Sequence, residues 1–523
     1  MHRRRVAITG LGILAPNGCG KDAFWEACLQ GRSGIQAITR FDTSMLATRI
    51  AGEITDFSPA TFGLTDHESL TLDRSTQFAI AAANLALEDA GIASISLQEQ
   101  ERENMGVYLG TAIASLEKGE DIWLYLSQQS ISGMKEPLPK KELTTFMLSY
   151  VPAAAIAVHH HLLGPCLTLS TGCSSGADAL GQAFWFIQEG RADRMLAGGC
   201  DAALLPIGLS VFNVIHALST NNDEPTRASR PYDARRDGFV LSEGAAVLLL
   251  EERELALARG AHIYAEIIAF SSNGNAYHMT ALPADGAPLQ MLLREVMQEA
   301  LISPKQLGYI NAHGSSTRTN DIAETVAYKG AFGADAYSIP ISSTKSLIGH
   351  TQGAASAIEA AITALALDQQ ILPPTINLEV PDPQCDLDYI ANVARVLPGE
   401  KPIQFALTHS SGFGGINTAL ILARHENLPR ASDFEDEQTR EIVHSALIRH
   451  PAVLSTSRPS ISRRVVITGL GLVAPNGIGK EAFWQSVRVG RKATGLFALQ
   501  HHTEHSFWPG GQIKDFRVEE YIE

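Results

Sequence analysis

Short apolar runs alternate with longer stretches of helical periodicity along residues 6–422. Apolar runs bounded by glycine predict buried strands, and alanine and leucine at helical spacing predict helices. We expect strands at residues 6–14, 105–109, 166–169, 245–250 and 263–270. We expect helices at residues 76–90, 174–189 and 353–367. This alternation predicts a layered α/β architecture.

Two glycine- and serine-rich turns each lead into an alanine-rich helix. Cys173 begins the first of these helices, and residues 353–367 form the second. The similarity indicates two related halves, divided near residue 255. We therefore expect one half over residues 1–255 and another over residues 256–424.

The pattern changes after Leu422. Residues 425–462 carry charges, prolines and serines with little periodicity, so we interpret them as a linker. Residues 463–491 then repeat residues 4–32, with 19 identities in 29 aligned positions at a constant offset of 459. We expect residues 463–523 to repeat an opening strand and helix. None of the later chemical motifs recurs there, so this tail cannot form a second active site.

Composition narrows the possible functions. The 523 residues carry a formal net charge of -15 and are 45% hydrophobic, which is typical of a globular protein and disfavours a nucleic-acid binder. No run of 18 apolar residues exists that would span a membrane. The basic start leads into a glycine-broken apolar run, so we interpret it as a first strand and not a signal peptide. Six cysteines without a CxxC pair argue against a zinc or redox motif and favour a reducing, cytoplasmic location.

The first chemical motif is Ser170-Thr-Gly-Cys173-Ser-Ser-Gly176. It places a thiol where a strand turns into a helix, with glycines that let a substrate approach the backbone. Free N–H groups and the dipole at a helix N-terminus stabilise a thiolate, so we expect the pKa of Cys173 to be lowered. The alternative is an inert buried cysteine, which we assign to the other five.

Two further motifs place a histidine in a small-residue turn after an apolar strand. These are Asn311-Ala-His313-Gly-Ser-Ser-Thr317 and Ser342-Ser-Thr-Lys345-Ser-Leu-Ile-Gly349-His350. A single histidine is usually structural, but two in such turns together with Cys173 favour catalysis. Metal binding is the rival interpretation, and no His-x-His or HExxH spacing supports it. Residues 159–161 are three consecutive histidines, which we interpret as a polar helix end, with metal binding as the alternative.

The fourth motif is the loop Ser410-Ser-Gly-Phe413-Gly-Gly415. Its backbone N–H groups could bind a developing oxyanion, or the loop could be a simple tight turn. A cysteine with two histidines fits acyl-thioester chemistry and also fits a cysteine hydrolase.

The four motifs, in this order, resemble those of the β-ketoacyl synthases of the thiolase superfamily, over residues 4–422. The resemblance implies a five-layered αβαβα fold of two duplicated halves. It implies an acyltransferase that condenses malonyl-carrier protein with an acyl chain on Cys173, losing carbon dioxide. His313 and His350 would stabilise the enolate, and Lys345 would orient the network around His350. Phe413 would be the gatekeeper and, with Cys173, an oxyanion donor.

The resemblance also implies supporting roles for Glu359, Asp321 and Glu324. It implies no metal and no organic cofactor, because phosphopantetheine arrives on the acyl carrier protein. The expected partners are that carrier protein and either a chain-length-factor-like subunit or a second copy of the chain.

Within the family the chain looks like the ketosynthase-alpha subunit of type II polyketide synthases, since a small residue, Ser411, precedes Gly412 where fatty-acid enzymes usually carry phenylalanine. The tail looks like the start of a chain-length factor. The alternatives are a homodimeric fatty-acid elongating ketosynthase and a catalytically silent scaffold, which would lack Cys173. Thr351, in place of serine, and Arg318-Thr319 depart from the usual polyketide pattern.

Overall fold

The computed structural model describes residues 4–132, 148–280, 282–425, 465–498, 507–513 and 516–520. The chain divides into two compact units, Met1–Leu428 and Pro429–Glu523. The linker expected over residues 425–462 lies outside the described residues except for His425.

The first unit is built on one 11-stranded sheet, which consists of two groups of five strands and the short strand β2 (Gly18–Cys19). The first group has the order β1-β8-β7-β5-β6, and the second has the order β9-β15-β14-β10-β11. The first-group strands are β1 (Val6–Ala15), β5 (Met105–Gly110), β6 (Cys166–Leu169), β7 (Arg194–Asp201) and β8 (Gly244–Glu252). The second-group strands are β9 (Ala265–Gly274), β10 (Leu307–Asn311), β11 (Ile341–Ser342), β14 (Phe405–Ser411) and β15 (Ile416–Ala423).

The two groups are copies of one topology. Counted along the chain, the first strand of each group pairs antiparallel with the fifth, and the fifth pairs antiparallel with the fourth. The other two pairings in each group are parallel. The two first strands, β1 and β9, pair with each other and join the groups. The duplicated halves predicted from the two motif-bearing turns are therefore confirmed by strand order and direction.

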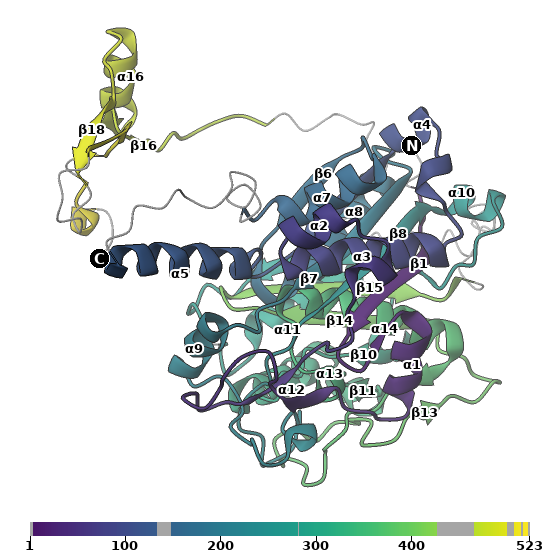
Figure 1. Ribbon diagram of the computed structural model, residues 1–523. Helices are drawn as coiled ribbons and strands as arrows, with labels where there is room; N and C mark the ends of the chain where they lie inside the picture. The colour runs from purple at the N-terminus through teal and green to yellow at the C-terminus, as the bar shows by residue number, and fades with distance from the viewer. Residues whose placement is uncertain are drawn as a thin grey trace. The chain divides into compact units, whose positions relative to one another are not determined.

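Helices cover both faces of each group of strands, giving the layer order αβαβα (Figure 1). The outer helices α3 (Arg74–Asp89) and α7 (Val151–His160) pack on the first group, and α11 (Ala287–Glu299) and α12 (Arg318–Phe332) pack on the second. The central helices α8 (Ser175–Gln188) and α14 (Ala355–Gln369) lie between the groups. Coverage on both faces explains the largely apolar runs of the most buried strands, β1 and β8.

The two central helices meet through small residues. A Cβ atom at Gly176 would lie 2.8 Å from the Cβ of Ala357, and the N–H of Ala177 donates to Ser356 Oγ at 2.9 Å. Each helix follows one of the motif-bearing turns, so this close contact brings the two turns together. The expected elements are present, with bounds that differ by up to four residues.

The three consecutive histidines end a helix, as expected. Helix α7 ends at His160, and His161 follows in the left-handed conformation, with φ of 53°. His159 Nδ1 pairs with Glu68 at 2.7 Å, and His160 Nδ1 lies 3.0 Å from Ser94 Oγ. Within the described ranges, no group of three metal-ligating side chains was found.

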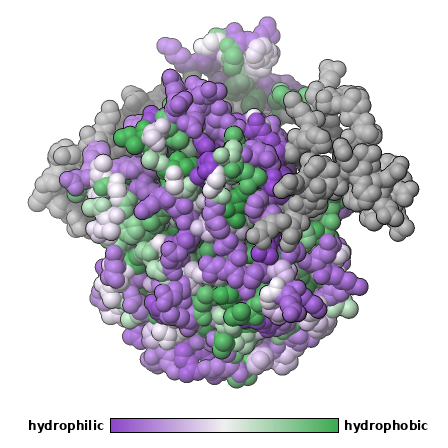
Figure 2. Space-filling view, turned by 90° about the vertical axis from the view of Figure 1, so that its right-hand side faces the viewer, coloured by the Kyte–Doolittle hydropathy of each residue, from purple (hydrophilic) through white to green (hydrophobic). Residues whose placement is uncertain are grey.

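Figure 2 shows a face on which hydrophobic residues lie in separate groups among hydrophilic ones, as is usual for scattered exposed apolar side chains. Among the described helices, none combines the length and apolar character that crossing a membrane requires.

The second unit repeats the local structure of the chain's start. Strands β16 (Val473–Ala474) and β17 (Gly477–Ile478) pair as β1 and β2 (Gly18–Cys19) do, and α16 (Lys480–Arg488) matches α1 (Lys21–Leu29), all at the offset of 459. The pairing of β18 (Thr494–Ala498) with β19 (Phe507–Gly511) likewise matches that of β3 (Ile35–Ala37) with β4 (Ile50–Gly52). The strand expected at residues 465–472 does not form; these residues lie in no strand. A strand needs neighbours for its backbone hydrogen bonds, and β1 obtains them from β8 and β9.

Candidate active site

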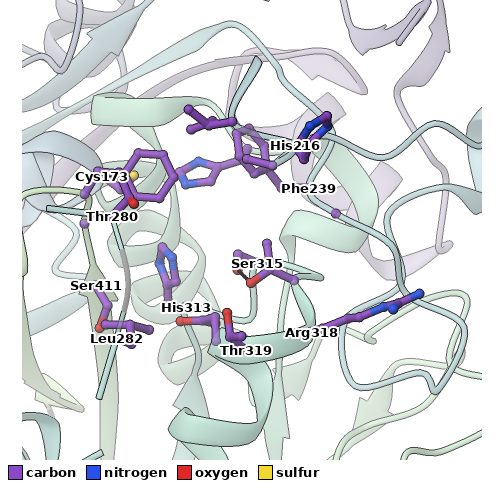
Figure 3. Close-up of a pocket in the computed structure, with 18 of the residues that line it drawn as sticks. Cys173, His216, Phe239, Thr280, Leu282, His313, Ser315, Arg318, Thr319 and Ser411 are labelled. Carbon is purple, nitrogen blue, oxygen red and sulfur yellow. Dashed lines mark hydrogen bonds between the residues drawn. The ribbon is translucent and has the colours of Figure 1, made fainter. Parts of the chain in front are cut away.

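Four of the predicted residues line one cavity of about 310 Å³ (Figure 3). They are Cys173, His313, His350 and Phe413. They come from both halves of the first unit, and the central helices described above bring them together. Arg318 and Thr319, the residues that depart from the polyketide pattern, also line this cavity, at the end away from Cys173.

Cys173 lies in a 3-10 turn, Gly172–Ser174, directly before α8, and is 7% exposed. Gly172 has φ of 65°, and a Cβ there would lie 2.8 Å from the carbonyl oxygen of Phe413. A Cβ at Gly412 would lie 3.0 Å from the Cys173 nitrogen. The two glycines therefore allow the nucleophile turn and the Phe413 loop to touch, and the N–H of Phe413 hydrogen-bonds to the Cys173 sulfur.

The expected lowering of the Cys173 pKa is wrong. Burial raises the pKa of this thiol to about 11, because a buried thiolate loses its hydration. The charge of Lys345 and the N–H of Phe413 both lower the pKa, but by less than burial raises it. The sequence showed the helix N-terminus and did not show how deeply the turn is enclosed.

His350 is held in one tautomer. Its Nδ1 accepts the backbone N–H of Gln352 at 3.1 Å, so its proton sits on Nε2. Burial and the charge of Lys345 hold the pKa of His350 well below its usual range. The ring is therefore neutral and presents an N–H donor.

His313 has the same electrostatic character. Burial, followed by the charge of Lys345, lowers its pKa well below the usual range. Its Nδ1 lies 3.2 Å from Ser410 Oγ and 3.4 Å from Lys345 Nζ. An ammonium can only donate, so Nδ1 accepts and the proton again sits on Nε2. The ring centres of His313 and His350 are 5.5 Å apart, with the planes at 80°.

Lys345 binds a different histidine from the one expected. The sequence-based interpretation placed it in the network around His350. In the structure its Nζ donates to the His313 carbonyl oxygen at 2.7 Å and to Glu359 Oε1. Lys345 begins α13 (Lys345–Ile348), and its side chain reaches the turn after β10 that contains His313. This direction could not be derived from sequence spacing.

Glu324 and Asp321 support the site without lining the cavity. Glu324 accepts the backbone N–H groups of His313 at 2.8 Å and Gly314 at 2.9 Å, which fixes the turn that presents His313. Asp321 accepts the N–H of Tyr232 at 3.0 Å and pairs with Arg236 at 3.4 Å. Burial raises the pKa of Asp321 to about 6.

Sequence analysis missed two supporting residues. Asp201, at the end of β7, accepts the N–H of Gly353 at 2.6 Å and that of Ala112 at 2.8 Å, so it anchors the turn after His350. His409 lies 2.7 Å from Glu324 Oε1 and 2.6 Å from the hydroxyl of Tyr328. The sequence signal was an ionisable residue within or at the end of a predicted buried strand: His409 lies in β14 and Asp201 ends β7.

Two glycines give the Phe413 loop a left-handed backbone. Gly414 and Gly415 adopt φ of 89° and 77°, which favours glycine. The ring of Phe413 is 37% exposed and lies 6.3 Å from the ring of Phe212. The N–H of Phe413 points at the sulfur, so a carbonyl bound to that sulfur would lie close to this donor.

Two family models match the chain. The model described as "Beta-ketoacyl synthase, N-terminal domain" matches residues 3–256 and again residues 462–515. The model described as "Beta-ketoacyl synthase, C-terminal domain" matches residues 264–379. The second match of the N-terminal model falls on the tail, in agreement with the internal repeat.

The chain is 44% identical over 420 residues to "Putative polyketide beta-ketoacyl synthase 1" of Streptomyces cyaneus, covering 80% of this chain and 98% of that protein. It is 42% identical over 431 residues to the "Tetracenomycin polyketide synthase ketoacyl synthase alpha subunit" of Streptomyces glaucescens, covering 80% and 97%. It is also 40% identical over 427 residues to "3-oxoacyl-(acyl-carrier-protein) synthase 2" of Synechocystis sp., covering 82% and 99%.

Two solved structures share the fold with a TM-score of 0.73 each. One is a type II PKS acyl-carrier protein in complex with its ketosynthase bound to the hexaketide, at 37% identity, covering 81% of this chain and all of the matched chain. The other is the ishigamide ketosynthase/chain length factor, at 31% identity and the same coverage.

Proposed function

The chain belongs to the β-ketoacyl synthase family, and from this premise we propose that it condenses malonyl-carrier protein with an acyl chain held on Cys173, in type II polyketide biosynthesis. The observation that carries the proposal is the meeting of a thiol, an N–H donor and two neutral histidines in one cavity.

The first half-reaction loads the acyl chain. The sulfur of Cys173 attacks the thioester carbonyl of an acyl-carrier protein, forming an enzyme thioester. The carrier's sulfur leaves and takes up the proton that the Cys173 thiol loses, so that the carrier departs as a thiol. The N–H groups of Cys173 and Phe413 hold the tetrahedral oxyanion.

The second half-reaction forms the carbon–carbon bond. Malonyl-carrier protein enters, and its carbon–carboxylate bond breaks to release carbon dioxide and leave an enolate. The Nε2–H groups of His313 and His350 donate to the enolate oxygen. The enolate carbon attacks the thioester carbonyl on Cys173, and the carbon–sulfur bond breaks. The sulfur leaves as a thiolate and takes a proton from solvent, which regenerates the free thiol. Neutral histidines suit this role because each keeps a proton to donate.

The protein needs no cofactor of its own in this scheme, because phosphopantetheine is part of the carrier-protein substrate. We also propose a cytoplasmic location, because six cysteines in 523 residues, with no CxxC pair, are typical of a reducing compartment.

The test is direct. The purified chain is incubated with an acyl-carrier protein and malonyl-carrier protein, and intact-protein and peptide mass spectrometry are used. We expect an acyl adduct on Cys173 and a β-ketoacyl product on the carrier. An acyl adduct on Cys173 without a β-ketoacyl product would show that the enzyme is loaded but does not condense, which would contradict the proposal.

The second candidate is fatty-acid elongation, which the 40% identity to the Synechocystis enzyme favours. The polyketide and fatty-acid functions can be distinguished by whether the enzyme condenses repeatedly on its own product. A polyketide enzyme extends its own unreduced β-ketoacyl product, whereas a fatty-acid enzyme requires that product to be reduced first. Assays without a ketoreductase should therefore yield more than one extension if the polyketide assignment holds.

We also propose a dimer, either with a chain-length-factor-like subunit or with a second copy. The solved relative is a ketosynthase/chain length factor. Strand β6 ends the sheet on the first-half side, and Cys166 and Leu167 on it are exposed, with Leu167 at 45%. A sheet edge of this kind is suited to pairing with another chain.

A further inference from the structure

Two polar side chains in the wall of the Cys173 cavity have no protein partner for a polar atom. Gln352 and Ser411 both line this cavity, and they are only 3% and 6% exposed. Among the described residues, neither Gln352 Nε2 nor Ser411 Oγ has a hydrogen-bond partner. Buried polar groups in proteins are almost always hydrogen-bonded. Two unpartnered groups in the wall of one cavity therefore point to a ligand that supplies the partners.

Gln352 lies two residues after His350, close to the nucleophile. It begins the 3-10 turn Gln352–Ala354, which packs against the turn that contains Cys173. Its φ is 54°, a left-handed conformation that is uncommon for a residue with a side chain and recurs at functional sites. Its backbone N–H donates to His350 Nδ1 at 3.1 Å. The backbone of Gln352 thus holds His350, and its side-chain amide is available to whatever occupies the cavity.

Ser411 reaches the cavity from the end of β14. The next residue is Gly412, where a Cβ would lie 3.0 Å from the Cys173 nitrogen, so Ser411 is also close to the nucleophile. In Figure 3, Ser411 and Cys173 lie on the same side of the cavity. The hydroxyl of the preceding residue, Ser410, donates to the Cys173 carbonyl oxygen at 3.1 Å. The two serines therefore differ: Ser410 supports the site, and Ser411 is left for a ligand.

An amide and a hydroxyl in this position distinguish between kinds of acyl chain. Water in the free cavity can hydrogen-bond both groups, and an acyl chain that enters displaces such water. An alkyl chain would leave the two groups unpaired, which is unfavourable in a buried site. A poly-β-ketoacyl chain carries a carbonyl oxygen on every second carbon atom, and each oxygen accepts hydrogen bonds. A site with buried donors discriminates against the analogue that lacks the acceptor.

We propose that Gln352 and Ser411 are specificity-determining residues, which donate hydrogen bonds to the keto oxygens of an unreduced acyl chain on Cys173. This inference rests on the proposed condensing function and extends it, because it assigns the choice between unreduced and fully reduced chains to two side chains. The N–H groups of Cys173 and Phe413 bind the oxygen of the thioester carbonyl. Gln352 and Ser411 bind the keto oxygens further along the chain.

Thr351 provides a matched control. Its Oγ1 is also buried without a hydrogen-bond partner among the described residues, and the residue is fully buried. Thr351 is not among the residues that line the cavity. Its methyl group lies toward Gly244, where a Cβ would be 3.4 Å from Thr351 Cγ2. The variant Thr351→Val therefore removes a neighbouring buried hydroxyl that an acyl chain in the cavity does not contact.

The test compares two four-carbon substrates that differ at one position, acetoacetyl-carrier protein with a keto group and butyryl-carrier protein without it. The proteins are the full-length wild type, Gln352→Leu, Ser411→Ala, the double variant and Thr351→Val. Mass spectrometry follows acyl-enzyme formation at Cys173 and gives a second-order rate constant for each substrate. The readout is the ratio of the acetoacetyl to the butyryl rate constant. General damage to the fold lowers both rate constants together and leaves this ratio unchanged.

We expect the ratio to be about ten-fold lower in the double variant Gln352→Leu/Ser411→Ala than in the wild type, equivalent to about 1.4 kcal/mol. The fall should come from slower loading of the acetoacetyl group. Each single variant should show part of it, and the single variants carry the test if the double variant does not fold. Thr351→Val should keep the wild-type ratio.

The contrary outcomes separate this inference from the proposed function. Unchanged ratios in the cavity variants, with loading and condensation intact, would overturn the inference and leave the proposed function standing. An equal fall in Thr351→Val would also overturn it, because the effect would then not depend on contact with the acyl chain. Failure of the wild type to load either substrate on Cys173 would contradict the proposed function, and the inference with it.

Discussion

Lys345 and Glu359 form an ion pair whose side chains are each 2% exposed, directly behind His313. A buried charge that loses its partner is strongly destabilising, whereas loss of both charges can be nearly neutral. We therefore expect Lys345→Met to lower the free energy of unfolding by about 3–5 kcal/mol. The double variant Lys345→Met/Glu359→Gln should recover much of this loss. Urea unfolding of both variants is the measurement, and equal destabilisation of the two would contradict the pairing argument.

Cys173 is the predicted nucleophile, so Cys173→Ala should abolish condensation. Decarboxylation of malonyl-carrier protein should persist at a reduced rate, because both histidines remain in place. Peptide mapping of the wild-type protein should find the acyl group on Cys173. Its appearance instead on Cys200, which is buried, or on Cys166, which is exposed, would refute the assignment.

The raised pKa of Cys173 predicts its reactivity without substrate. At a thiol pKa of about 11, the thiolate fraction increases about ten-fold per pH unit throughout the neutral range. The alkylation rate of Cys173 by iodoacetamide should therefore climb steadily between about pH 6 and about pH 9. A plateau below about pH 8 would mean that the thiolate is already formed in the free enzyme.

His313→Ala and His350→Ala should each impair decarboxylation while leaving acylation of Cys173 detectable. The reason is that both rings donate to the enolate oxygen and neither touches the loading step in the proposed mechanism. Separate assays of carbon dioxide release and of acyl-enzyme formation measure the two steps. Loss of loading alone in either variant would show that the histidine has another role.

The lowered pKa values of the two histidines set the pH dependence of decarboxylation. Each ring is neutral above its folded pKa, which lies well below the usual value, so the rate should hold between about pH 8 and about pH 6 and fall only at lower pH. The charge of Lys345 contributes to this lowering. Lys345→Met should therefore raise the pKa values of both histidines, so that the decarboxylation rate begins to fall at a higher pH than in the wild-type enzyme. An unchanged pH profile would exclude Lys345 from this electrostatic role.

Truncation after Arg424 should leave the fold and condensation of the first unit intact. That unit contains the complete sheet and every residue that lines the cavity. Thermal unfolding and product formation by the truncated chain are the measurements, with the full chain as control. An insoluble or inactive product would show that the tail belongs to the working enzyme.

The sequence by itself predicted the strands, the helices and the motif-bearing turns, because hydrophobic periodicity and glycine placement act locally. The resemblance of its motifs to those of a known family assigned Cys173, His313, His350 and Phe413 to one active site. The sequence did not predict the direction of Lys345 or the contribution of Asp201. These depend on which residues from other elements lie across the site, and residue spacing does not contain that information.

Two outcomes were decided only by the tertiary structure. The pKa of Cys173 follows from its enclosure between the two halves, which outweighs the helix N-terminus visible in the sequence. The second concerns two nearly identical segments: residues 6–15 form a fully buried strand, while residues 465–472 form none. The hairpin and helix after each segment recur because their hydrogen bonds are local. A strand's hydrogen bonds must come from distant parts of a sheet, and among the described residues β8 and β9 supply them to the first copy.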